Sequence, residues 1–184
     1  MAKKSKKELD FIDNLSCGVD LHNRQLYVIG IIDSATAHKF IASLKLIDKT
    51  KGDINIMINS PGGEEASGFG MYDALKMTKN KTVASVYGEA SSIAAVVLQG
   101  AKVRKMTEHS TILIHNGIMK MQKESLQDYV ENMAKNIKVI NEMYYSILSN
   151  KDFYKMQAFY ELGRKETLFT AKEALTFGLI DEII

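Results

Sequence analysis

The stretch from Lys81 to His115, KTVASVYGEASSIAAVVLQGAKVRKMTEHSTILIH, decides the fold of this chain. It opens with the apolar, β-branched run Thr82–Tyr87, which predicts a buried strand. Gly88 then allows a sharp turn, and the apolar run Ile93–Leu98 predicts a buried helix. A further strand is predicted for Ser110–Ile114. This alternation of strands with a helix indicates an α/β fold.

Two serines lie where the predicted helix begins. The first turn of a helix has unpaired N–H groups and the positive end of the macrodipole, so an alkoxide or an oxyanion is stabilised there. Ser91 and Ser92 are therefore candidate nucleophiles, and His115, at the end of the next strand, is a candidate base. The alternative is that both serines only cap the helix, as serine often does.

The segments before this stretch continue the α/β pattern. Strands are predicted for Leu26–Ile32 and Asp53–Ile58, and a helix for Ser34–Ile47 with Ser34 as its cap. After a Pro-Gly-Gly break, another helix is predicted for Gly68–Met77. We therefore expect a mainly parallel sheet covered by helices.

The segments after His115 predict a long amphipathic helix with a narrow apolar seam, because apolar residues alternate spacings of four and three. The seam packs either on the chain's own core or, if the helix protrudes, against another subunit. Two shorter helices are predicted for residues 152–162 and 170–177, and a strand for residues 178–180. The seam consists of Leu126, Val130, Met133, Ile137, Ile140, Tyr144 and Ile147.

Composition and charge narrow the class of protein. The 184 residues predict one domain, residues 17–184, preceded by a lysine-rich arm, residues 1–16. The 24 basic and 22 acidic side chains leave a formal net charge of +2, which gives no indication of nucleic acid as a partner. A single cysteine, with neither a signal peptide nor an apolar run long enough to cross a membrane, predicts a cytoplasmic protein.

The sequence predicts no cofactor. It has no P-loop motif, so the chain does not use ATP through such a loop. His22, His38 and His109 are scattered without the spacing of metal ligands. We therefore expect chemistry carried by side chains and main-chain groups alone.

The motif Asn59-Ser60-Pro61-Gly62-Gly63 contains the only proline of the chain. A glycine pair at the end of a strand lets main-chain N–H groups point at a ligand without interference from a Cβ atom. Alone, the motif would be read as a simple turn. Together with a serine at a helix start and a histidine at a strand end, it predicts one half of an oxyanion hole for acyl transfer.

The three motifs NSPGG, GEASSIAA and the strand ending in His115 together resemble the Clp protease proteolytic subunit, a caseinolytic serine peptidase. The resemblance implies a crotonase-like ββα superhelix with a parallel sheet, covering helices and a protruding long helix. It places the nucleophile on Ser92 rather than Ser91, where the family usually has alanine. It places the base on His115 and the oxyanion donors on the amides of Gly63 and Ile93.

The third catalytic residue departs from the family pattern. The family has an aspartate shortly before the last helix, and the matching position here is Glu166. A glutamate can orient an imidazole, as Ser-His-Glu triads on other folds do. Asp152 and Asp181 are the alternative candidates.

Two further departures concern the substrate. Glu64 and Glu65 follow Gly63 where the family has an apolar strand beside the bound peptide, so we expect them on such a strand, with one of the two facing the cleft. They either shape the substrate preference, favouring basic side chains, or are simply solvated. Asn116-Gly117 replaces the family's proline and glycines after the histidine, which predicts altered contacts between rings.

The resemblance implies a serine endopeptidase that hydrolyses unfolded proteins inside a self-compartmentalising homo-oligomeric ring. The implied ring is heptameric, with stacking of rings left open, and a separate AAA+ unfoldase would feed it. One alternative is a phage-type maturation peptidase that works without an unfoldase. Others are an inactive scaffold subunit and a crotonase-type enzyme acting on acyl-CoA, against which the Ser–His pair speaks.

Overall fold

The computed structural model describes residues 18–117 and 127–184 of the chain. Within them, eight strands form one sheet and six helices accompany it. In chain order these are β1 (Val19–Asp20), β2 (Gln25–Ile32), α2 (Ser34–Ile47), β3 (Ile54–Gly63), α3 (Glu65–Lys76), β4 (Thr82–Ser91), α4 (Ile93–Gly100), β5 (Val103–Met106), β6 (Thr111–Ile114), α5 (Gln127–Leu148), α6 (Phe153–Gly163), β7 (Thr167–Thr170), α7 (Ala171–Thr176) and β8 (Glu182–Ile183).

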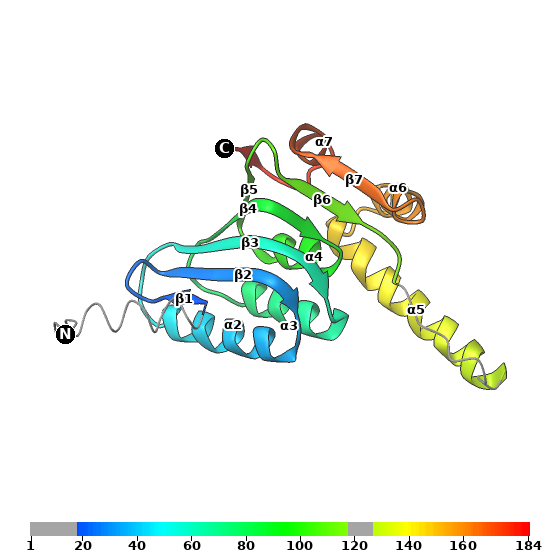
Figure 1. Ribbon diagram of the computed structural model, residues 1–184, viewed down its shortest axis with the longest axis horizontal. Helices are drawn as coiled ribbons and strands as arrows, with labels where there is room; N and C mark the ends of the chain where they lie inside the picture. The colour runs from blue at the N-terminus through cyan, green and yellow to red at the C-terminus, as the bar shows by residue number, and fades with distance from the viewer. Residues whose placement is uncertain (1–17, 118–126) are drawn as a thin grey trace, which may run out of the picture.

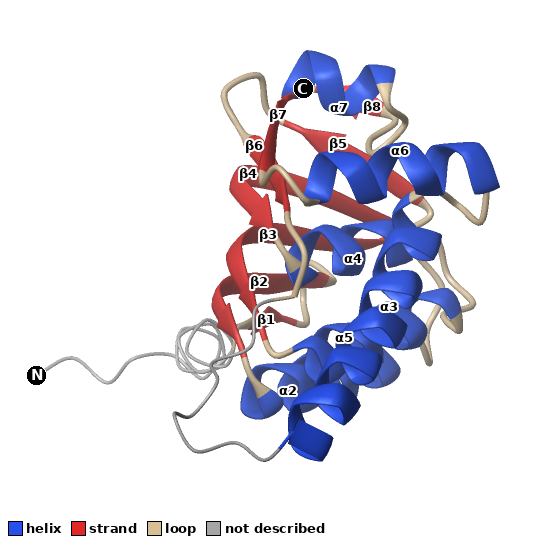
Figure 2. Cartoon of the chain, turned by 90° about the vertical axis from the view of Figure 1, so that its right-hand side faces the viewer, coloured by secondary structure: helices blue, strands red, loops and turns tan. Residues whose placement is uncertain are grey.

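The sheet is mainly parallel, as predicted. Its main path runs β1-β2-β3-β4-β5-β8, and β6 and β7 extend it from β4. Only the β1–β2 and β6–β7 pairs are antiparallel. Figure 2 shows helices α2 to α6 together on one side of the strands. The predicted α/β architecture is therefore confirmed.

Strand β4 is longer than predicted, because Gly88 does not turn the chain. Val83–Val86 pair with β5, whereas Glu89–Ser91 pair with β6. Gly88 lies between the two halves with a φ of 97°, and a Cβ atom there would come within 2.6 Å of Asn59 Oδ1. The glycine therefore lies where the strand changes partners, so that the end of β4 pairs with β6 instead of β5.

Strand β3 also continues through the Pro-Gly-Gly segment, where a break was predicted. It continues through Pro61 to Gly63 and pairs with β2 to its end. The register with β4 shifts between Ile58 and Ser60, so the proline lies beside an irregularity, where a missing ladder N–H is tolerated. The Pro-Gly-Gly segment is thus the carboxyl end of a central strand.

The helices follow the predictions with changes at their ends. The bounds of α2 are those predicted, but Asp33 rather than Ser34 caps it, accepting a hydrogen bond of 2.7 Å from the Thr36 amide. Helix α4 is buried along its whole length, as predicted, and lies between the sheet and α3. The strand predicted for residues 178–180 is absent from that segment, and the last strand is β8.

The predicted long helix is α5. Its outer part projects away from the sheet, while its carboxyl-terminal part lies against the core (Figure 1). Tyr144 and Tyr145 near that end are buried, whereas Val130 and Ile137 in the outer part are only half-buried. Leu126, the first residue of the predicted seam, lies outside the described residues. The seam therefore packs on the core at its inner end, and packing of the outer part against another subunit stays a prediction.

Candidate active site

Ser92 has an unusual backbone conformation. It links β4 to α4 with φ 55° and ψ −128°, a region that residues with side chains rarely occupy. Such a conformation costs on the order of 1–3 kcal/mol and persists only where its surroundings hold it. The Ser92 amide donates to the Leu113 carbonyl over 2.8 Å, and the Ser92 carbonyl accepts from the Tyr144 hydroxyl over 3.2 Å and the Ala95 amide over 3.0 Å. A strained serine between a strand and a helix is the geometry of a nucleophile elbow.

The two serine hydroxyls have different environments. Ser92 precedes α4 but its side chain makes no capping hydrogen bond. Ser91 belongs to β4, is buried, and donates its hydroxyl to the Glu89 carboxylate over 2.6 Å. The alternative that both serines only cap the helix is therefore wrong. The Ser91 hydroxyl is hydrogen-bonded to a carboxylate, whereas Ser92 is half-buried at the helix start.

His115 reaches the site through strand β6. Ser91 pairs with Leu113 in the parallel β4–β6 ladder, and His115 follows two residues later, directly after the strand ends. Side chains two residues apart lie on the same face of a strand, so His115 and Leu113 share a face. The sheet therefore brings His115 to the strand next to the one that ends in the serines.

The imidazole is held by a main-chain group. His115 Nδ1 lies 2.7 Å from the Asn116 carbonyl oxygen. A carbonyl only accepts, so Nδ1 is the donor, and in the neutral ring Nε2 then carries the lone pair that a general base requires. Among the described residues no hydrogen bond joins the Ser92 hydroxyl to this ring. Catalytic hydrogen bonds are often long without substrate and tighten in the substrate complex.

Glu166 lies across the ladder from His115. The last antiparallel pair of β6 and β7 is Ile114 with Thr167, and the same register continued by one residue opposes His115 to Glu166. The Glu166 backbone has φ 52° and its amide donates to the Gly163 carbonyl over 3.2 Å. Its carboxylate is exposed and has no hydrogen-bond partner within the described part of the chain. The continued register thus sets Glu166 opposite the histidine, and among the described residues no hydrogen bond joins the two.

The two alternative carboxylates are engaged elsewhere. Asp152 caps α6 by accepting from the Lys155 amide over 2.9 Å. Asp181 binds Arg104 through the main-chain amide and the guanidinium. Burial acts to raise the pKa of Asp181, but the hydrogen bonds from Arg104 outweigh it and hold the pKa below its usual value. Glu166 is the one of the three carboxylates that the register sets opposite His115.

The end of β3 lies directly against the serine. A Cβ atom on Gly62, which has φ 94°, would come within 2.8 Å of the Ser92 Cβ atom and 3.2 Å of the Ile93 amide nitrogen. Only glycine allows this approach at this φ. The amide of Ile93 opens α4, where N–H groups lack helical partners, and Gly63 follows Gly62 as the last residue of β3. The two predicted donor amides therefore come from elements in contact at Ser92.

The expected strand after Gly63 does not form. Helix α3 begins at Glu65 with Glu64 as its cap residue, so the two glutamates do not alternate along a strand. Glutamates stabilise the first turn of a helix by interacting with its dipole, and this competes with the extended conformation. Glu64 is exposed and accepts from the Ser67 hydroxyl over 2.9 Å. Glu65 is half-buried, and its Oε1 lies 3.9 Å from where a Cβ atom on Gly117 would be. Its effect on substrates remains a prediction.

Three residues at the inner end of α5 also contact the site, in roles that the sequence did not indicate. Besides the Tyr144 bond to Ser92, Asn141 accepts from the Gly117 amide over 3.1 Å, and the Tyr145 hydroxyl donates to Asn116 Oδ1 over 2.7 Å. Burial raises the pKa of Tyr145, so its hydroxyl keeps its proton and remains a donor. One signal was available, since Asn141 is a polar residue at helical spacing from the apolar seam residue Ile137.

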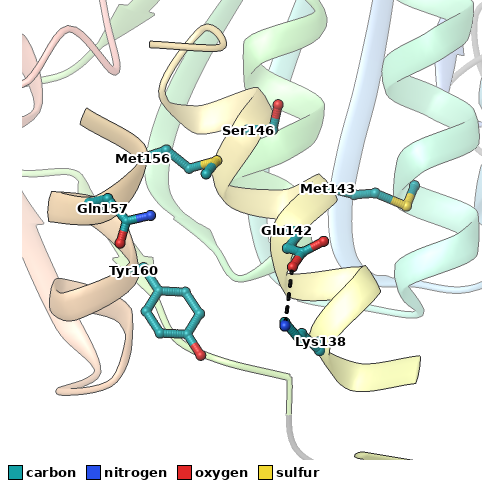
Figure 3. A pocket seen from close by; sticks show the side chains of 7 residues that line it. All are labelled: Lys138, Glu142, Met143, Ser146, Met156, Gln157 and Tyr160. Carbon is teal, nitrogen blue, oxygen red and sulfur yellow. Dashed lines mark ion pairs between the residues drawn. The ribbon is translucent and has the colours of Figure 1, made fainter. Parts of the chain in front are cut away.

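One groove among the described residues lies away from these groups. It has a volume of about 570 Å³ between α5 and α6 and is lined by Lys138, Glu142, Met156 and Tyr160, among others (Figure 3). It contains no predicted site residue, so we place the active site by the serine geometry rather than by the groove.

Among residues 18–117 and 127–184, no cluster of His, Cys, Asp or Glu could hold a metal ion. No helix in these ranges is long and apolar enough for a membrane span.

Comparison with known proteins identifies relatives along most of the chain. Residues 11–184 match the family model described as Clp protease. The chain is 31% identical over 172 residues to the ATP-dependent Clp protease proteolytic subunit 1 of Protochlamydia amoebophila, which covers 89% of this chain and 82% of that protein. It is 32% identical over 157 residues to the ATP-dependent Clp protease proteolytic subunit of Bacteroides thetaiotaomicron, covering 83% and 70%. The corresponding subunit of Carsonella ruddii is 29% identical over 169 residues, covering 89% and 85%.

Proposed function

Because this chain belongs to the Clp protease family, we propose that it is a serine endopeptidase in which Ser92 is the nucleophile and His115 the general base. The observation that carries the proposal is the strained backbone of Ser92 at the start of a buried helix. The Ser92 side chain makes no capping hydrogen bond there, and a histidine follows the neighbouring strand. A nucleophile held in this conformation presents its hydroxyl away from the main chain of the helix.

The proposed reaction is acyl transfer to the serine followed by hydrolysis. His115 Nε2 takes the Ser92 proton as the hydroxyl attacks the peptide carbonyl, and later gives it to the leaving amine. The amides of Gly63 and Ile93 would stabilise the negative charge on the carbonyl oxygen. Glu166 would stabilise the imidazolium that forms. Water then attacks the acyl-enzyme, again with His115 as base.

The proposed setting is a closed assembly. A peptidase with an open Ser–His site would cleave the proteins around it, so we propose that copies of this chain form a ring with the sites inside. The relatives are named ATP-dependent, and this chain has no P-loop motif. We therefore propose that an AAA+ unfoldase supplies unfolded proteins in the cytoplasm. The exposed apolar residues of α5 support the assembly part of this proposal.

The decisive experiment compares the two serines. We expect Ser92→Ala to abolish hydrolysis of a fluorogenic peptide and labelling by a fluorophosphonate, because the nucleophile is lost. Ser91→Ala is the matched control and should retain most of both activities, since its hydroxyl is bound to Glu89. Mass spectrometry of the labelled protein should find the probe on Ser92. A probe on Ser91, or equal loss in both variants, would contradict the assignment.

A parent protein that is folded but takes no label would favour the inactive scaffold subunit. A protein that cleaves a short peptide and has no dependence on any unfoldase would favour the maturation peptidase. Both rivals share the fold, so activity measurements rather than further geometry separate them.

A further inference from the structure

The His115 imidazole is oriented by a chain of hydrogen bonds that begins on α5. The Tyr145 hydroxyl donates to the Asn116 side chain over 2.7 Å, and the Asn116 carbonyl accepts from His115 Nδ1, also over 2.7 Å. The same residue thus contacts the tyrosine with its side chain and the histidine with its main chain. Contacts that hold Asn116 in place therefore also hold its carbonyl oxygen, the acceptor that sets the tautomer of His115.

The position of the tyrosine is closely constrained. Its ring is fully buried and makes edge-on contacts with Tyr144 and Tyr160, at centroid distances of 5.0 and 5.5 Å. A Cβ atom on Gly163 would come within 1.7 Å of the Tyr145 hydroxyl oxygen, so only glycine at that position leaves room for it. The hydroxyl therefore lies in close contact with the end of α6, next to the backbone that leads to Glu166.

The acceptor segment is held from the other side as well. The Asn116 amide donates to the Gly163 carbonyl over 3.3 Å, and Asn141 binds the Gly117 amide. Asn116 is half-buried and follows the last residue of β6 by two positions, where ladder hydrogen bonds no longer restrain the chain. Its side-chain bond to Tyr145 adds a third restraint to these two main-chain bonds.

We propose that Tyr145 is a positioning residue for His115, acting through Asn116, which holds the imidazole as the Nδ1–H tautomer with Nε2 free to accept the serine proton. The inference rests on the proposed function, since it assigns a role within the same reaction. Tyr145 does not touch the reacting atoms. It acts by keeping one carbonyl oxygen in place.

The test removes a single hydroxyl. Tyr145→Phe keeps the buried ring, and we expect kcat for a fluorogenic peptide to fall about five- to tenfold, the effect of one lost hydrogen bond, with KM changed by less than about twofold. Tyr160→Phe is the matched control, because Tyr160 packs on the same ring and its hydroxyl lies at the groove between α5 and α6 (Figure 3). It should keep the parent kcat. A purely structural effect of Tyr145→Phe would lower the fraction of protein whose Ser92 reacts with the fluorophosphonate, and would leave kcat per reactive site unchanged.

A double-mutant cycle tests the route through Asn116. Asn116→Ala keeps the main-chain carbonyl but removes the side-chain tether, so it should reproduce the loss of kcat. The double variant should lose no more than either single variant, because both changes remove the same contact. Losses that multiply, or a Tyr145→Phe variant with the parent kcat, would overturn the proposal.

A spectroscopic measurement separates this inference from the proposed function. In protein labelled with ¹⁵N-histidine, the neutral His115 ring should give the nitrogen shifts of the Nδ1–H tautomer, and Tyr145→Phe should move them toward a mixture. This readout does not require activity. A parent that neither cleaves nor labels would refute the proposed function, while unchanged nitrogen shifts in Tyr145→Phe would refute the role of Tyr145.

Discussion

The conformation of one residue, Ser92, sets the requirements for its neighbours. Its positive φ is maintained by hydrogen bonds from three elements, namely β6, α4 and α5. A cost on the order of 1–3 kcal/mol at this residue is a sizeable part of a typical domain stability. Packing around the serine therefore has to be correct before the hydroxyl is presented, which links folding to catalysis at a single backbone position.

We predict that Glu166 contributes less than the aspartate of a chymotrypsin-type triad. The Asn116 carbonyl already fixes the tautomer, and the Glu166 carboxylate is exposed, so it mainly stabilises the imidazolium through solvent-screened attraction. Glu166→Gln should lower kcat by about tenfold to a hundredfold, well short of the roughly 10⁴-fold loss known for the buried aspartate. Steady-state kinetics on a fluorogenic peptide measures this.

Glu161→Gln is the control for that prediction, since Glu161 is an exposed glutamate on the adjoining helix, paired with Arg164 over 3.5 Å. It should retain the parent kcat. If Glu166→Gln were as inactive as Ser92→Ala, the carboxylate rather than the carbonyl would set the tautomer. If Glu166→Gln were fully active, Glu166 would have no part in the reaction.

At the scale of elements, the sequence predicted which segments are strands and helices better than it predicted their ends. Apolar periodicity depends on burial, so it located α2, α4 and α5 correctly. It could not show that β4 changes partners at Gly88, because strand pairing is a long-range property. It also misplaced Glu64 and Glu65, whose charges suit a helix start as well as they suit an exposed strand.

The same limit explains the partial prediction of the site. Ser92 and His115 could be proposed from the sequence because their motifs are local and resemble a known family. Asn141, Tyr144 and Tyr145 were missed because their roles come from contacts between distant segments, which the sequence alone does not show. Residues that position others through their main chain leave no side-chain signature.

The stability of the protein should depend on pH through Asp181, which links β5 to the segment before β8. Its lowered pKa means that the charged form stabilises the fold above the unfolded pKa of about 3.9, and that this contribution disappears as the pH falls through the lower, folded value. Asp181→Asn should lower the Tm by about 2–4 °C near neutral pH, corresponding to about 1 kcal/mol for this partly exposed pair. The difference from the parent should vanish in acid.

Asp53→Asn is the comparison for this measurement, because Asp53 and Lys81 form an exposed ion pair at 3.5 Å that should contribute little. Thermal melts of the parent and both variants across the acid range would measure the difference in Tm at each pH. A Tm difference for Asp181→Asn that persists or grows in acid would show that the lost contact is not a charged one.

At the scale of the molecule, α5 carries apolar surface that a single chain leaves open. Tyr129 and Val139 of α5 are about half exposed, at 53% and 54%, and the outer part of this helix projects from the body (Figure 1). Apolar surface left exposed in a soluble protein can mark an interaction surface. They accord with the proposal that copies of this chain assemble.

Light scattering at micromolar concentration should therefore give a mass several times the 20.6 kDa of one chain. Ile137→Glu, which places a charge on the half-buried seam, should reduce that mass. Lys135→Glu changes a neighbouring exposed residue and should not. A parent protein that is monomeric under these conditions would refute enclosure of the sites.

The antiparallel β6–β7 ladder is four residue pairs long and lies at the margin of the sheet, whereas the first half of β4 is enclosed by β3 and β5. Margins open in local fluctuations that need less free energy than global unfolding. Amide hydrogens of Thr167–Thr170 should thus exchange with solvent sooner than those of Val83–Val86. The groups around His115 depend on the part of the molecule that loosens first, so the enzyme would lose its working geometry on warming while most of the fold is still intact.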